Sequence, residues 1–88
     1  MTVSIVVPTR DRPDRLARCL AALQAQTVAD LECVVVDDAS VDADAVAAAV
    51  AAAPRARLLR GEGRGPAAAR NLGVRAARGE IVCLTDDD

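Results

Sequence analysis

The chain has 88 residues, of which 52% are hydrophobic and 27% are charged, a composition typical of one folded unit rather than a disordered segment. It contains no Trp, Tyr or Phe, so a small core must form from Val, Leu, Ile and Ala, and we expect marginal stability. A net charge of −2 with interspersed signs argues against a general attraction to nucleic acid or to an anionic membrane.

The three cysteines, Cys19, Cys33 and Cys83, lie in apolar stretches without C-x-x-C spacing, and the chain has no His. We therefore expect reduced cysteines in the core of a cytoplasmic protein rather than a zinc site. No run approaches the roughly 20 apolar residues that span a membrane, and the N-terminus enters an apolar strand at once. Neither a signal peptide nor a spanning segment is expected.

The first predicted element is a strand over 3–7, a β-branched run that ends at Pro8. A helix is predicted over 14–26, because its apolar residues recur at i, i+3, i+4 and i+7 and Pro13 suits the first helical position. Residues 31–36 form the second predicted strand.

An Ala-rich helix is predicted next, opened by Asp37 and Ser40 as N-terminal capping residues and stopped by Pro54. Residues 55–59 read as a third, weaker strand, and a glycine-rich loop follows it.

The last helix is predicted over 67–78, begun by Pro66 and closed by Gly79. Residues 80–84 form the fourth predicted strand, with Cys83 and Leu84 expected in the core. The alternation of strands and helices predicts an α/β fold, a Rossmann-like parallel sheet with helices on both faces, because the crossover between parallel strands is right-handed.

Polar residues follow the predicted strands, and in an open parallel sheet ligands bind outside the carboxyl ends of the strands. Three aspartates, Asp86 to Asp88, stand together after the fourth strand, and such a cluster needs a neutralising cation. Mg²⁺ or Mn²⁺ would bridge one or two carboxylates to phosphate oxygens, so a nucleoside diphosphate fits this edge. Asp38, after the second strand, would accept a hydrogen bond from a base N–H or a ribose hydroxyl.

Three blocks in this order, "VSIVVPTRDRPDRLARCLAAL", "VVVDDAS" and "GPAAARNLGVRAARGEIVCLTDDD", resemble the opening of family 2 glycosyltransferases with the GT-A fold. The resemblance implies the strand order 3-2-1-4 and a nucleotide sugar of the UDP, GDP or dTDP type as donor. It implies that the nucleotide is bound by Pro8, Thr9, Arg10, Asp11, Asp38, Arg70 and Asp86, and the metal by Asp87 with Asp88.

The sequence departs from the family at Arg10, where many relatives have an aromatic residue that stacks on the base. A guanidinium can also stack, but the base preference stays open. The general base of inverting members and the acceptor-binding region would lie beyond Asp88. We therefore expect 1–88 to be a partial domain, truncated after the acidic motif, with no catalytic base and little activity alone.

Other classes of protein share parts of this pattern. A non-catalytic nucleotide-binding or interaction module on the same half-fold remains an alternative. A receiver domain is less favoured, because its acidic pair should follow the first strand, where "PTRDR" stands. The glycines of "GEGRG" follow the third strand, which is the wrong place for a dinucleotide fingerprint.

The fourth strand, 80–84, carries no Pro or Lys. In the order 3-2-1-4 it lies at an edge, where unpaired backbone groups invite another strand. We therefore expect the chain to self-associate or to remain partly molten.

Overall fold

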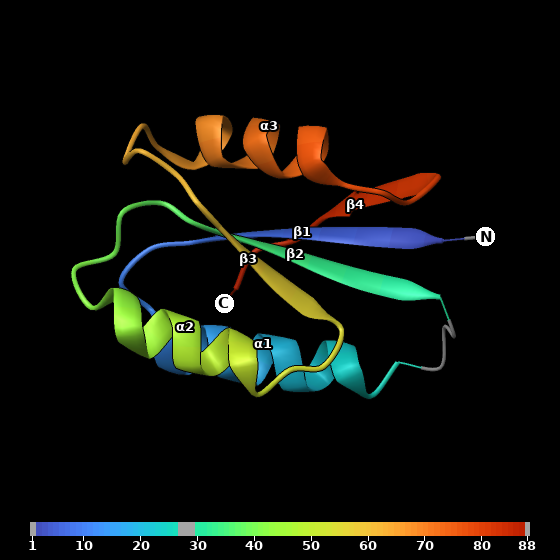
Figure 1. Ribbon diagram of the computed structural model, residues 1–88, viewed down its shortest axis with the longest axis horizontal. Helices are drawn as coiled ribbons and strands as arrows, with labels where there is room; N and C mark the ends of the chain where they lie inside the picture. The colour runs from blue at the N-terminus through green and yellow to red at the C-terminus, as the bar shows by residue number, and fades with distance from the viewer. Residues whose placement is uncertain (1, 27–29, 88) are drawn as a thin grey trace.

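The computed structural model describes residues 2–26 and 30–87 (Figure 1). The strands and helices alternate along the chain: β1 (Val3–Thr9), α1 (Pro13–Gln24), β2 (Leu31–Asp37), α2 (Ala43–Ala51), β3 (Ala56–Arg60), α3 (Pro66–Ala76) and β4 (Ile81–Leu84). Each element predicted from the sequence is present, with ends that shift by a few residues.

The four strands form one parallel sheet in the order β3-β2-β1-β4, as predicted. β1 extends past its expected end and includes Pro8, which pairs in register with Val36 of β2. On the other side of β1, the pairing with β4 stops at Val6 and Leu84. Pro8 therefore fits in the strand, because its missing N–H would point to the side where no strand remains to pair with it.

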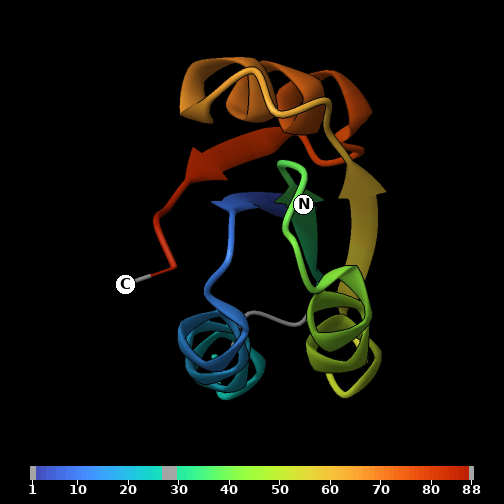
Figure 2. The same cartoon turned by 90° about the vertical axis from the view of Figure 1, so that its left-hand side faces the viewer.

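Helices cover both faces of the sheet, as expected for an α/β fold. Figure 2 shows α1 and α2 side by side on one face and α3 on the other, with β4 at one edge of the sheet. Within the described residues, no helix has the length and apolarity needed to cross a membrane.

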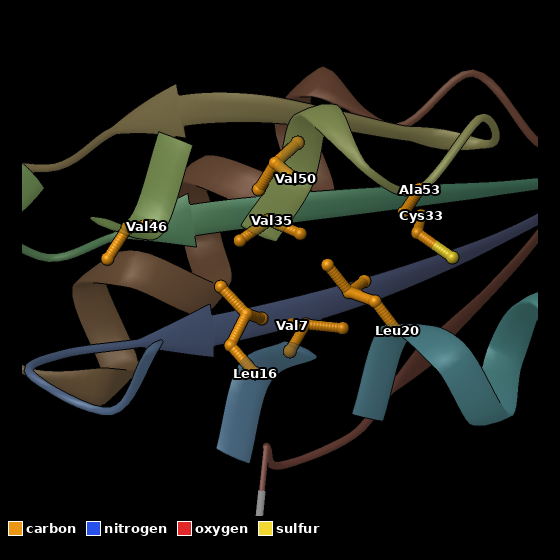
Figure 3. Packing of buried hydrophobic residues seen from close by; sticks show 8 residues of the cluster. All are labelled: Val7, Leu16, Leu20, Cys33, Val35, Val46, Val50 and Ala53. Carbon is orange, nitrogen blue, oxygen red and sulfur yellow. The ribbon is translucent and has the colours of Figure 1, made fainter. Parts of the chain in front are cut away.

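The core lies between the sheet and the pair α1 and α2 (Figure 3). Val7 and Val35 project from β1 and β2 toward Leu16, Leu20 and Val46 of the helices, and all five are fully buried or nearly so. Val6 and Val36 are the neighbours of Val7 and Val35 in sequence, and they face α3 instead. Successive side chains of a strand point to opposite faces of the sheet.

α3 packs close to the sheet because it has a glycine at the contact. A Cβ atom added at Gly73 would lie 2.3 Å from Cγ1 of Val6 and 3.2 Å from Cγ2 of Val36, so only glycine fits without a shift. This contact fixes the height of α3 above β1 and β2, and with it the position of residues at the start of the helix.

The prediction that Cys83 and Leu84 lie in the core is wrong. All four residues of β4 are exposed, and Leu84 is 53% exposed. β4 is the edge strand of the sheet and pairs only with β1, so its other edge is left without a partner among the described residues. Cys33 is buried as expected, whereas Cys19 is only partly buried beside the core.

The N-terminal cap of α2 is also not where it was predicted. Asp42 caps the helix by accepting a hydrogen bond from the N–H of Ala45 at 3.0 Å. Asp37 and Ser40 stabilise the preceding loop instead: Asp37 Oδ1 accepts from the N–H of Ser40, and the Asp37 carboxylate pairs with Arg60. Both types of residue satisfy loop N–H groups as readily as helix N–H groups.

Candidate functional site

A cleft of about 300 Å³ opens at the carboxyl edge of the sheet, the edge that faces the viewer in Figure 2. It lies between the loop after β1, the start of α3 and the segment after β4. Its lining includes the predicted site residues Pro8, Thr9, Arg10, Asp38, Arg70, Asp86 and Asp87, together with Arg12, Gly65, Pro66 and Ala69. Strand ends that are far apart in sequence thus meet in one place, because all four strands run in the same direction.

Asp87 is held against β1 by two partners. Its Oδ2 accepts a hydrogen bond from the Thr9 hydroxyl at 2.6 Å, and its Oδ1 lies 3.3 Å from Nη1 of Arg12. Thr9 is 4% exposed and Asp87 is 5% exposed, so this carboxylate is nearly removed from solvent. A charge buried to that extent requires an ionic or hydrogen-bonding partner, and here it has both.

Asp38 is bound by the glycine-rich loop between β3 and α3. Its two oxygens accept hydrogen bonds from the N–H groups of Gly63 and Gly65, each at 2.9 Å. Gly63 and Gly65 have φ values of 77° and 99°, a region that favours glycine, which is why the loop can turn both N–H groups toward one carboxylate. Each carboxylate oxygen has a second lone pair, so Asp38 can still accept a hydrogen bond from a ligand.

Arg70 and Asp86 face each other across the cleft. Nη2 of Arg70 lies 3.7 Å from Oδ1 of Asp86, and both side chains are well exposed. The cleft is lined by three arginines and three aspartates, so its formal charges balance: Arg10, Arg12 and Arg70, and Asp38, Asp86 and Asp87. A diphosphate bound in the cleft would add negative charge that these side chains do not neutralise, unless a cation were bound with it.

Asp11 does not line the cleft. It has a φ of 56°, its N–H donates to Oγ of Ser40 at 2.9 Å, and its Oδ1 accepts from the N–H of Val41 at 2.8 Å. The side chain therefore joins the loop after β1 to the loop after β2. Asp88, the second residue predicted to hold the metal, lies outside the described residues.

Arg12 and the two glycines that bind Asp38 were not among the site residues predicted from the sequence. Arg12 lies in the same loop as Arg10, between the first strand and Pro13. Its position after the carboxyl end of that strand could have indicated that it lines the site. The pairing of Arg12 with Asp87 joins residues 75 positions apart, so no local pattern could reveal it.

The carboxylates of the cleft suit a hard divalent cation in their chemistry. Asp86 and Asp87 offer the oxygen ligands that Mg²⁺ and Mn²⁺ prefer. The part of the chain that the structure describes holds no group of three or more acidic, His or Cys side chains arranged to bind a metal. Mg²⁺ usually completes its coordination with waters and phosphate oxygens.

The thiol of Cys19 lies beside this end of the cleft. Its Sγ donates to the carbonyl oxygen of Asp86 at 3.8 Å. Burial, and then the negative charge of Asp87, raise the pKa of Cys19 above its ordinary value. The thiol is therefore protonated at neutral pH and is a poor nucleophile.

The family model described as Glycosyl transferase family 2 matches residues 4–88. Among curated proteins, the chain is 39% identical over 87 residues to the succinoglycan biosynthesis protein ExoO of Rhizobium meliloti. The match covers 98% of this chain and 25% of that protein, so the chain spans about a quarter of that relative's length.

The chain is also similar in fold to solved structures that include a mannosyltransferase and S. aureus TarS. A mannosyltransferase of Pyrobaculum calidifontis in complex with GDP-Man and Mn²⁺ is 35% identical, with a TM-score of 0.87 over 98% of this chain and 27% of that one. S. aureus TarS 1-349 in complex with UDP-GlcNAc is 28% identical, with a TM-score of 0.82 over 100% of this chain and 27% of that one.

Proposed function

The chain belongs to glycosyltransferase family 2, and on that premise we propose that it forms the nucleotide-sugar-binding part of an enzyme that transfers a sugar to an acceptor hydroxyl. The observation that carries the proposal is the cleft, which gathers nearly all the residues predicted to bind the nucleotide and metal. The similar structures in complex with GDP-Man and UDP-GlcNAc support this donor class.

The diphosphate would lie between Arg70 and the acidic segment Asp86–Asp87. Arginine matches the oxygens of a phosphate in geometry and charge, and Arg70 is exposed enough to turn toward one. Asp38, already fixed by the two loop glycines, would present a free lone pair to a base N–H or a ribose hydroxyl. Asp11 would act indirectly, by holding the loop that carries Arg10.

We propose that Asp87 takes part in holding Mn²⁺ or Mg²⁺, with Asp86 facing the ribose and Asp88 as a second metal ligand. A divalent cation bound there would stabilise the charge that develops on the departing nucleoside diphosphate. The arginines that line the cleft would also stabilise the negative charge on the nucleoside diphosphate, because they line the same cleft as Asp87. A general base for the acceptor hydroxyl would be supplied by a part of the enzyme outside these 88 residues.

Calorimetric titration with UDP, GDP and dTDP tests the proposal, each with Mn²⁺ and with a chelator. We expect tighter binding with Mn²⁺, because the balanced charges of the cleft do not offset a diphosphate. Equal affinity in both conditions would contradict the metal role, and no binding of any of the three nucleotides would contradict the donor site.

Arg70→Ala should weaken nucleoside diphosphate binding by about tenfold or more, because a hydrogen bond to a charged group contributes about 1.5–3 kcal/mol. The matched control is Arg75→Ala, which removes the same charge from the same helix but does not line the cleft. If both variants weaken binding equally, Arg70 acts only through the net charge of the protein.

A further inference from the structure

The two oxygens of the Asp87 carboxylate have unequal partners. Oδ2 accepts a hydrogen bond at 2.6 Å from the hydroxyl of Thr9, a buried residue of β1. Oδ1 faces Arg12 at 3.3 Å, and the Arg12 side chain is 49% exposed. Of the two partners, Arg12 is therefore the one that can leave without disturbing the sheet.

Arg12 supplies the positive charge that the buried Asp87 carboxylate requires when no cation is bound to it. Asp87 is 5% exposed, and a carboxylate so far removed from water is costly to keep ionised without a positive charge nearby. Thr9 supplies a hydrogen bond but no charge. Arg12 neutralises the carboxylate and, by doing so, holds the segment after β4 against the end of β1.

A divalent cation at this oxygen would compete with Arg12, because both are positively charged. With Oδ2 bound to Thr9, the accessible side of Asp87 is Oδ1, where the guanidinium stands. A metal ion there would place two positive charges a few ångströms apart, and these repel even at the dielectric constant of water. Metal binding to Asp87 thus favours movement of Arg12 away from Oδ1, and Arg12 lines the cleft in which the diphosphate would lie.

We propose that Arg12 is an exchangeable counter-cation of Asp87: it pairs with the carboxylate in the empty cleft and passes to a phosphate of the nucleotide when a divalent cation binds Asp87. This inference rests on the proposed metal role of Asp87. The exchange makes the two ligands cooperative, because the metal releases Arg12 for the phosphate and the phosphate draws Arg12 away from Asp87. Such coupling is reciprocal, so each ligand raises the affinity for the other by the same factor.

The test is a Mn²⁺ titration without nucleotide, followed by the paramagnetic resonance signal of free Mn²⁺. Arg12→Ala should raise the Mn²⁺ affinity roughly three- to tenfold, because it removes the competing charge. Arg12→Gln, which keeps a hydrogen-bond donor for Asp87, should do the same and serves if the alanine variant unfolds. Arg75→Ala is the matched control: Arg75 is exposed in the last turn of α3 and does not line the cleft, and we expect a change below about twofold.

The same variants should lose cooperativity. With UDP or GDP present, the gain in Mn²⁺ affinity caused by the nucleotide should be several-fold smaller in Arg12→Ala and Arg12→Gln than in the unchanged protein. Unchanged or weaker Mn²⁺ binding in both Arg12 variants, with Asp87→Asn abolishing it, would overturn the exchange while leaving the metal role intact. Mn²⁺ binding that Asp87→Asn does not alter would overturn the metal role and the exchange together.

Discussion

Replacing Gly73 with alanine should destabilise the protein, although alanine is the better helix former. An alanine Cβ at this position would lie 2.3 Å from Cγ1 of Val6, at least about 1 Å closer than an ordinary van der Waals contact. Val6 is a fully buried residue of β1 at the contact with α3, and its β-branched side chain is restricted in its rotamers. α3 must therefore move outward from the sheet.

Two opposing effects set the size of the change in the free energy of unfolding caused by Gly73→Ala. Removing a glycine from a helix interior contributes about 0.8–1 kcal/mol of stability. Overpacking a tight contact costs about 1–3 kcal/mol. We expect a net loss of up to about 2 kcal/mol in the free energy of unfolding, measured by urea denaturation. Nucleoside diphosphate binding should weaken as well, because the start of α3 carries Arg70 and forms one wall of the cleft.

A double-mutant cycle separates the contact from the helix. Val6→Ala makes room for the new methyl group, so the double variant should be more stable than the sum of the single effects by about 1 kcal/mol. Ala67→Gly, at an exposed position of the same helix, measures the propensity effect alone. Additive effects of Gly73→Ala and Val6→Ala, or a stabilised Gly73→Ala protein, would refute the reasoning.

Two further predictions concern other parts of the fold. Burial alone would raise the pKa of Glu32, but hydrogen bonds from Ser4, the Arg78 N–H and Arg57, with the Arg57 charge, outweigh burial and lower it. The carboxylate therefore stabilises the fold above its unfolded pKa, about 4.3, and this stability is lost as pH falls through the lower folded pKa. Glu32→Gln should cost about 1–3 kcal/mol in urea denaturation at pH 7 and progressively less in acid, and a constant difference would contradict this. Val82→Lys should reduce self-association in light scattering, because it places a charge on the exposed edge strand, and unchanged scattering would contradict that role of β4.

The sequence alone determined the succession of strands and helices and the common direction of the strands, whereas the strand order 3-2-1-4 was implied by the family resemblance. Apolar runs of strand length alternate with helical periodicity, and the handedness of the crossovers then requires a parallel sheet with helices on both faces. The same rule brought the polar residues after β1, β2 and β4 to one edge, so Thr9, Asp38 and Asp87 could be predicted to lie near one another. Local sequence is enough for these features because each depends on periodicity and chain direction.

Only the tertiary structure decided which of those polar groups contact one another. Asp11 could be predicted at the edge, but the positive φ that turns it out of the cleft depends on contacts with the loop after β2. The exposure of Leu84 likewise depends on the place of β4 at the edge of the sheet, and not on the apolar character of the side chain. Arg12 approaches Asp87 because two loops meet at the ends of neighbouring strands, and a side chain's partner across such a gap is set by packing rather than by local propensity.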